Sequence, residues 1–286
     1  MDGAAGGPKE KGGKRVKSKA RTSALYIYAI GREQGLRKLF DANNLPGGVA
    51  AGVPVALVTE GKLAAVVSEV PLSDFGSGRF EKNLQDPKWA AERVMRHEQL
   101  AEFISLKEPV VPLRFGVLYT SPEPIREMLA KRRDQLEGVL ERISDREEWG
   151  LNVLSDAKKL QERMVDLSPR LAELQTRAKA ATPGQAYLLA KKLESLRGTE
   201  GKSETRRIVK EIREQVETNT DGIKDISIRE VESKQHPAVV GKWSCLVPRK
   251  ARKRFHSMAG KLAKQYAPFG LKFELTGPWP PYNFSE

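Results

Sequence analysis

The chain has 286 residues, 39% of them hydrophobic, and a formal net charge of +13, so it is long enough for about two domains with cores of their own. Its mean hydropathy of −0.50 predicts a soluble protein, and its longest apolar run, residues 49–58, is too short to cross a bilayer. The single cysteine, Cys245, cannot form an internal disulfide, which favours a reducing cytoplasm.

The positive charge is concentrated in two short segments. Residues 1–22 contain seven basic and two acidic side chains and show no hydrophobic periodicity, which predicts a disordered basic tail. Residues 248–254 contain five basic side chains in seven positions. Such segments attract polyanions, but they are more often solubilising tails or solvated helix faces.

The N-terminal half shows the pattern of an α+β domain over residues 23–145. A tyrosine-rich strand at 24–30 precedes a short helix at 32–40 and a hairpin of two strands, 53–59 and 62–68, joined by Glu60-Gly61. A helix starts at Asp86-Pro87, and a strand at 110–119 leads into a further helix over 122–143. The order is β-α-β-β-α-β with one trailing helix.

The strand at 110–119 is the segment around which we organise this half. With a period of two, one face is apolar and is expected in the core: Val111, Leu113, Phe115, Val117 and Tyr119. The other face includes Pro112, Arg114 and Gly116, which do not form a second core layer. We therefore expect an open face there. Arg114 is a candidate either for a structural ion pair or for contact with a partner.

The C-terminal half, residues 146–286, repeats the order with added helices. It has a strand at 148–154, a helical insertion over about 156–218, a hairpin of 223–232 with 239–247, a basic helix at 250–266 and a closing strand at 269–275. Helix starts at Ser168-Pro169 and Thr182-Pro183 lie within the insertion. We predict an α+β fold of two tandem ferredoxin-like domains, each with a four-stranded sheet covered by helices on one face.

Several enzyme and metal signatures fail on inspection. Gly198–Ser203 ends like a phosphate-binding loop, but Leu196 stands where its first glycine is required, and the segment is helical. His97-Glu98 lacks the second histidine of a zinc-protease helix, and the chain has only three histidines. His97 lies on an apolar helical stripe, where a hydrogen-bonded core histidine is expected. We expect no enzyme activity, metal or cofactor.

The tail at 277–286 combines three prolines with aromatic side chains, Trp279, Tyr282 and Phe284. A rigid backbone with large apolar rings suits docking on a partner. The alternative, which we favour, is that the tail folds back over its own sheet or over the domain junction.

Six ordered segments carry a resemblance to a known family: LYIY at 25–28, His97-Glu98, PVVPLRFG at 109–116, EWGLNVL at 148–154, GQAYLL at 184–189 and GPWPPYNF at 277–284. Together they resemble the gas vesicle protein L/F family over residues 23–286. The resemblance implies an accessory protein of gas vesicle assembly, a minor vesicle component in the cytoplasm. It also implies binding to the small hydrophobic shell protein during nucleation, which prevents that protein's aggregation, and partnership with other gas vesicle accessory proteins.

The candidate partner-binding residues are Arg114, Pro112, Gly116, Trp279, Tyr282 and Phe284. An apolar shell protein aggregates easily before assembly, and a charged partner with an open face would cover it. The alternative function is RNA binding through ferredoxin-like sheets and basic patches. Neither half has the aromatic-rich strand on which such proteins stack bases, so nucleic acid is not the favoured partner. Whether the chain is of the L or the F type stays open.

Overall fold

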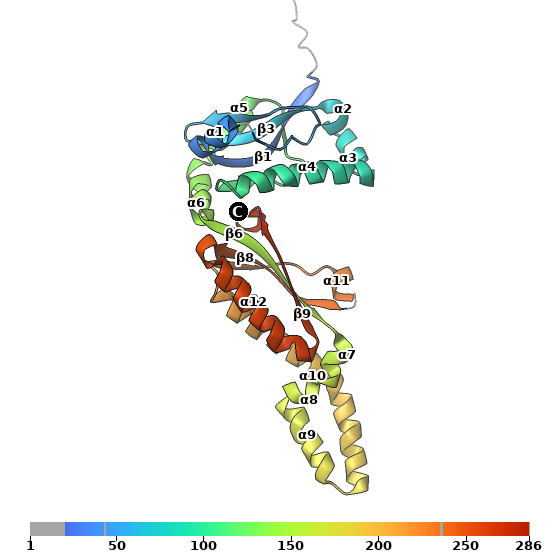
Figure 1. The fold of residues 1–286 in the computed structure, drawn as a ribbon. Helices are drawn as coiled ribbons and strands as arrows, with labels where there is room; N and C mark the ends of the chain where they lie inside the picture. The colour runs from blue at the N-terminus through green and yellow to red at the C-terminus, as the bar shows by residue number, and fades with distance from the viewer. Residues whose placement is uncertain (1–20, 43, 235–236, 286) are drawn as a thin grey trace, which may run out of the picture.

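The computed structural model describes residues 21–42, 44–234 and 237–285 (Figure 1). It confirms the predicted α+β class: two antiparallel sheets, one in each half of the chain, are packed with helices. The predicted disordered basic tail, residues 1–22, lies outside the described residues apart from its last two.

The N-terminal sheet is built from five strands. They are β1 (Ser23–Arg32), β2 (Val55–Glu60), β3 (Leu63–Pro71), β4 (Val110–Pro112) and β5 (Leu118–Tyr119). The order is β2-β3-β1-β4, and β5 also pairs with β1. The hairpin predicted at Glu60-Gly61 is confirmed, because Glu60 pairs with Leu63 and Gly61 has the positive φ of 58° that a tight turn requires.

Helices cover both faces of this sheet. They are α1 (Glu33–Asp41), α2 (Leu72–Phe75), α3 (Arg79–Asn83), α4 (Pro87–Ser105), α5 (Pro122–Lys131) and α6 (Arg133–Ile143). One face packs Tyr26 and Tyr28 of β1 against α1, α2 and α4. The opposite face packs Ile27 and Ile30 against α5 and α6. The prediction of a single covered face is therefore wrong here, because the apolar stripes of α5 and α6 give the second face its own core.

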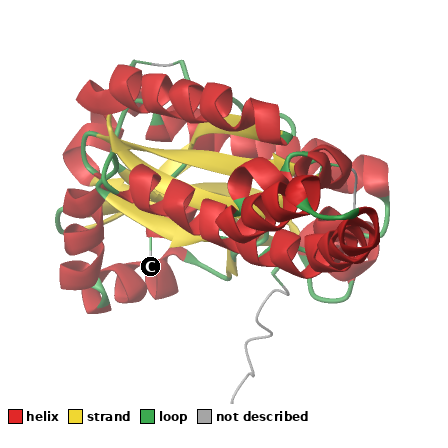
Figure 2. Cartoon of the chain, turned by 90° about the horizontal axis from the view of Figure 1, so that it is seen from below, coloured by secondary structure: helices red, strands yellow, loops and turns green. Residues whose placement is uncertain are grey.

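The C-terminal sheet has four strands in the order β7-β8-β6-β9. The strands are β6 (Arg146–Ser155), β7 (Gly222–Asp225), β8 (Ala238–Pro248) and β9 (Leu271–Trp279). The helices are α7 (Ala157–Glu162), α8 (Met164–Leu167), α9 (Pro169–Ala180), α10 (Pro183–Glu217), α11 (Glu230–Lys234) and α12 (Arg252–Tyr266), with 3₁₀ turns η1 (Arg249–Ala251), η2 (Ala267–Phe269) and η3 (Tyr282–Phe284). In Figure 2, which looks along the molecule so that its two halves overlap, the strands of both sheets lie among the helices.

All four helix starts expected from a capping residue followed by proline are confirmed. Helices α4, α5, α9 and α10 each begin at the predicted proline. At α4 the Asp86 carboxylate accepts hydrogen bonds from the backbone N–H groups of Lys88 and Trp89 at 2.9 and 3.3 Å. Asp86 therefore satisfies two of the donors that the first helical turn leaves unpaired.

The helical insertion forms a hairpin that extends away from both sheets (Figure 1). Helix α10 runs unbroken from Pro183 to Glu217, although two glycines at 198 and 201 weaken its middle. Near the sheet it contributes Ile208, Ile212 and Val216 to the C-terminal core. Farther out, α9 and α10 pack together with α7 and α8 through a small apolar cluster.

The two halves share one core cluster. Leu246 of β8 and Phe284 of the tail join the cluster formed by β1, α5 and α6. Phe284 is only 5% exposed, so the tail closes the junction. This confirms the interpretation in which the tail folds back within the chain.

The strand predicted at 110–119 is interrupted. It forms β4 and β5 with a loop over 113–117 between them. Gly116 adopts a φ of 94° in this loop, and the Phe115 ring packs on the α4 side of the sheet. Leu113 and Val117 pack on the α5–α6 side. The prediction that Phe115 shares a face with these residues is therefore wrong.

Candidate functional site

The loop at 113–117, helix α4 and the C-terminal tail meet at the junction between the halves. We call Tyr26, His97, Glu98, Leu113 and Tyr282 the junction cluster. The hydroxyl of Tyr282 donates to the Glu98 carboxylate, 3.1 and 3.2 Å from its two oxygens, and lies 3.2 Å from His97 Nε2. A side chain of the tail is thus held by a helix that precedes it by some 180 residues.

The hydrogen bonds around His97 define its tautomer. Nε2 lies 3.0 Å from the carbonyl oxygen of Leu113, which can only accept, so Nε2 carries the proton. Nδ1 therefore accepts from the Tyr26 hydroxyl at 2.9 Å. That hydroxyl in turn accepts from the backbone N–H of Gly116 at 2.9 Å. His97 thus fixes both ends of the loop, and the expectation of a hydrogen-bonded core histidine is confirmed.

Burial perturbs the titration of every ionisable member of the cluster. Desolvation lowers the pKa of His97 to about 4 and outweighs the hydrogen bond to Leu113, which raises it, so the ring is neutral near pH 7. Desolvation also raises the pKa of Tyr26, Tyr282 and Glu98. The cluster is therefore a network of neutral hydrogen-bonding groups around one carboxylate.

The tail is anchored by two further contacts. The Glu148 carboxylate on β6 accepts from the backbone N–H and the side-chain amide of Asn283 at 3.0 and 2.6 Å. Burial raises the pKa of Glu148, which is 4% exposed. Arg142 of α6 donates to the carbonyl oxygen of Phe284 at 2.9 Å. Both halves of the chain therefore bind the same three-residue turn, η3.

Part of the basic segment at 248–254 has a structural role. Arg249 donates to the carbonyl oxygens of Leu106 and Ser105 at 2.9 and 3.2 Å, at the C-terminal end of α4, where a cation stabilises the helix. Arg252 pairs through two nitrogens with the carboxylate of Glu147, which is 4% exposed. These two arginines are thus engaged within the chain.

The six candidate partner-binding residues differ in exposure. Pro112 and Phe284 are buried, so the expectation that Pro112 lies on an open face is wrong. Gly116 is half-buried, and a Cβ there would lie 2.9 Å from the Phe80 ring. Tyr282 is half-buried in the junction cluster. Arg114 is exposed, and Trp279 is 48% exposed. Only these last two offer a side chain to a partner.

Sequence reasoning did not identify Glu98, Glu148 or Arg249 as parts of the junction. The pair His97-Glu98 stood out in the sequence as part of the family resemblance. The residues that it contacts could not be predicted, because they lie in distant segments, Tyr282 among them. Five of the six segments that carry the family resemblance meet here, and the sixth, 184–189, lies at the far end of the α9–α10 hairpin (Figure 1). There Tyr187 and Leu188 are each 66% exposed.

The arrangement favours neither metal binding nor base stacking. Across residues 21–42, 44–234 and 237–285, no three His, Cys, Asp or Glu side chains are grouped to hold a metal ion, and no helix is long and apolar enough to cross a membrane. Both faces of the N-terminal sheet are covered. One face of the C-terminal sheet is covered by α10 and α12, and the other carries Asn152, Lys242 and Glu274 rather than aromatic rows.

Comparison with known proteins gives consistent matches in sequence. Residues 24–286 match the model of the family described as "Gas vesicle synthesis protein GvpL/GvpF". Gas vesicle protein L of Streptomyces sp. (strain CB03234) is 26% identical over 271 residues, covering 91% of this chain and 92% of the relative. Gas vesicle protein F1 of Halobacterium salinarum (strain ATCC 700922 / JCM 11081 / NRC-1) is 26% identical over 265 residues, covering 92% and 93%.

Two crystal structures show a similar fold. The gas vesicle protein GvpF from Anabaena sp. PCC7120 matches with a TM-score of 0.62 at 16% identity, covering 93% of this chain and 97% of the other. GvpF from Microcystis aeruginosa matches with a TM-score of 0.57 at 15% identity, covering 92% and 99%. Since the family match spans nearly the whole chain, the chain belongs to the GvpL/GvpF family of gas vesicle synthesis proteins.

Proposed function

We propose that this protein is a non-catalytic accessory factor of gas vesicle assembly that binds the small hydrophobic shell protein during nucleation and prevents its aggregation. The observation that carries the proposal is the family match over residues 24–286. The gas vesicle relatives match at more than nine-tenths of their own length, so no large part of them lacks a counterpart here. The cytoplasm, at the vesicle surface, is the corresponding location.

We propose further that each half, 23–145 and 146–286, is a ferredoxin-like unit. The strand orders β2-β3-β1-β4 and β7-β8-β6-β9 support this, because each is 2-3-1-4 in the numbering of its own half, with every pairing antiparallel. The helical hairpin α9–α10 is then an insertion in the second unit. The two units contact each other through the shared cluster that includes Leu246 and Phe284.

The proposed contact surface includes the tip of that hairpin. Tyr187 and Leu188 are exposed large hydrophobic residues on adjacent positions. Grouped apolar side chains at the end of a protruding element are costly in water and typical of interaction sites. Arg114 and Trp279 are the remaining exposed candidates. An exposed ion pair at Arg114 would contribute only about 0–1 kcal/mol, so we assign most of the affinity to apolar contacts.

The test is co-purification of the shell protein with this protein from cells that express both. A variant with Tyr187→Ser and Leu188→Ser should recover at least tenfold less shell protein and leave more of it aggregated. The control Lys191→Ser changes an exposed side chain one turn further along α10 and should match the parent. Arg114→Glu should reduce recovery by about fivefold at most. If the parent recovers no shell protein, direct binding is refuted.

A further inference from the structure

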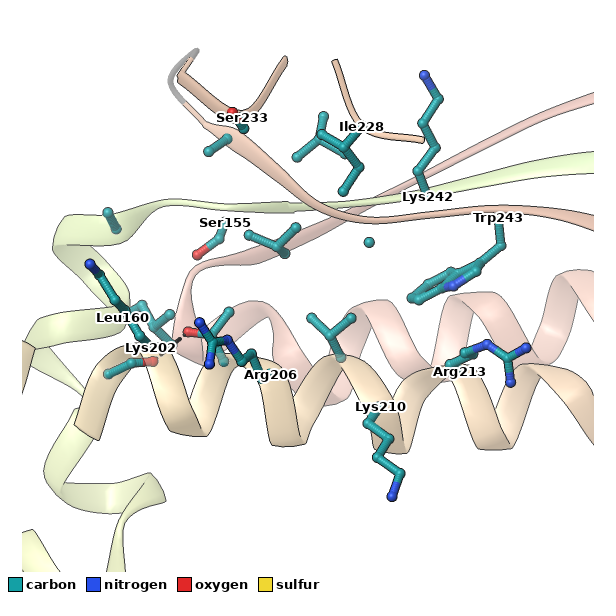
Figure 3. Close-up of a pocket in the computed structure, with 18 of the residues that line it drawn as sticks. Ser155, Leu160, Lys202, Arg206, Lys210, Arg213, Ile228, Ser233, Lys242 and Trp243 are labelled. Atoms are coloured by element: carbon teal, nitrogen blue, oxygen red, sulfur yellow. Dashed lines mark hydrogen bonds between the residues drawn. The ribbon is translucent and has the colours of Figure 1, made fainter. Parts of the chain in front are cut away.

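A groove lies in the C-terminal half, far from the junction cluster. It has a volume of about 830 Å³ and runs between α10 and the end of β8 nearest α11. Its apolar lining includes Val209 of α10 and Val239 and Trp243 of β8. Figure 3 shows the Trp243 ring lying between the strand and the helix. The groove is large enough for a substantial ligand.

Basic side chains outnumber acidic ones in the lining of the groove. Five basic residues and one acidic residue line it. Three of the basic residues are neutralised within the chain: Arg213 by Glu217 and Asp225, Lys242 by Glu232, and Lys210 by Glu214.

Lys202 and Arg206 differ from these three. Both are exposed, and neither has an ion-pair partner among the described residues. In Figure 3 both side chains lie on the side of α10 that faces the strand, whereas Lys210 points away from it. Within the part of the chain whose side chains are described, the groove therefore presents two cations without an ion-pair partner beside an apolar floor.

The apolar surface continues beyond the groove. Ile228, which lines it, is 36% exposed, and Val231 on α11 is 71% exposed. A small amphiphilic molecule bound on the floor would leave Val231 in water and Ile228 only partly covered. An occupant that covers them must be as wide as a protein element.

The geometry favours a helix over an added strand. Beside the groove β8 continues past its pairing with β7, which ends at Trp243, but the β6–β8 ladder is interrupted by a bulge near Val239. A bulged edge of about four residues is a poor template for strand addition. The stretch of α10 that lines the groove, 201–213, is about 18 Å long at 1.5 Å per residue, which matches about three turns of a docked helix.

We propose that this groove binds an acidic amphipathic α-helix of a partner protein. The apolar face of that helix would lie on the partly exposed side chains of Val209, Ile228 and Val240, above the buried Trp243. Two of its carboxylates, four residues apart, would face Lys202 and Arg206, which are also four residues apart. The proposal goes beyond the shell-binding function and does not depend on it. The chain's own N-terminal segment is excluded as the occupant, because its charge is +5.

The test uses four fluorescein-labelled 18-residue peptides: an acidic amphipathic helix, the same helix with lysine for glutamate, the same helix with two central prolines, and an acidic strand-forming peptide. Fluorescence anisotropy at physiological salt should show the acidic helix binding at least tenfold more tightly than the other three. Hydrogen exchange should show protection over 201–213 and 226–233 when that peptide binds.

Variants locate the site. Lys202→Glu with Arg206→Glu should weaken binding of the acidic helix at least tenfold, whereas Lys210→Glu, the matched charge reversal one turn on, should change it less than twofold. Ile228→Ser, which leaves the charge unchanged, should weaken it about threefold, and all variants should melt as the parent does. The proposal is overturned if the proline peptide or the strand peptide binds as tightly as the acidic helix, or if the double variant binds the helix normally. It is also overturned if dodecanoate competes with the helix while the helix gives α10 no protection from hydrogen exchange. Conversion of a dimer to a monomer by the double variant would likewise overturn it, because the occupant would be a second copy.

Discussion

Acidification from pH 7 to pH 5 should destabilise the folded protein through His97. The ring is fully buried, and its pKa falls to about 4 in the folded chain from about 6.5 in the unfolded chain. The unfolded state therefore takes up a proton first, and stability is lost as the pH falls from about 6.5 toward 4. At 1.36 kcal/mol per pKa unit, this amounts to about 2 kcal/mol by pH 5 and about 3 kcal/mol by pH 4.

Two carboxylates act in the opposite direction. Burial raises the pKa of Glu98 and Glu148, so their contribution to stability is greatest at low pH and is lost as the pH rises through their folded-state pKa values. The pH dependence of the parent therefore mixes both effects. A His97→Gln variant isolates the histidine, since glutamine can donate and accept hydrogen bonds but does not titrate here.

The assay is urea unfolding followed by circular dichroism at pH 7, 6 and 5. The parent should lose about 2 kcal/mol more stability between pH 7 and pH 5 than His97→Gln does, although the variant is less stable at pH 7. His256→Gln makes the same replacement at an exposed site on α12 and should follow the parent. Parallel pH curves for the parent and His97→Gln would refute the assignment of a buried neutral imidazole.

Three further outcomes follow from the packing. Arg252→Ala should lower the free energy of unfolding by about 1–3 kcal/mol in chemical denaturation, because it removes the bidentate partner of the buried Glu147 carboxylate. The control Arg254→Ala, at an exposed position, should change it by less than about 0.5 kcal/mol, and equal losses in the two variants would exclude a specific pair. Gly116→Ala should cost about 1–3 kcal/mol because of its positive φ and a nearby phenyl ring, and an unchanged melting temperature would contradict the loop geometry. Burial raises the pKa of Cys245 to about 12, so iodoacetamide at pH 8 should label this thiol only after the protein unfolds. Mass spectrometry measures the labelling, and rapid labelling of the native protein would place the thiol at the surface.

Local signals were sufficient to predict many of the elements. The proline-marked helix starts were correct because the fixed φ of proline acts within the first turn, and at α4 and α9 the side chains of Asp86 and Ser168 also cap the helix. The burial of His97 followed from the apolar stripe on which it lies. The β2–β3 hairpin followed from its two-residue turn.

The interruption of the strand at 110–119 depends on distant residues. The alternation of apolar residues predicted that Phe115 and Leu113 share one face of a strand. Instead the chain turns at Gly116, whose N–H donates to the hydroxyl of Tyr26, 90 residues away in sequence. The second covered face likewise depends on α5 and α6 folding back over β1. Spacing rules describe one element at a time and carry no information on such contacts.

The shared core has a consequence for the timing of folding during synthesis. The cluster beneath α5 and α6 is complete only when Phe284 arrives, and Glu98 receives its hydroxyl donor only from Tyr282. At about 5–20 residues per second, a ribosome needs roughly 7–28 s to travel from the end of α6 to that turn. Throughout that interval the first half of the nascent chain exposes an unfinished apolar face. Chaperone binding to the nascent chain should therefore be greatest before the last turn leaves the exit tunnel. A run of slowly translated codons in α9–α10 would lengthen the interval in which the apolar face is exposed.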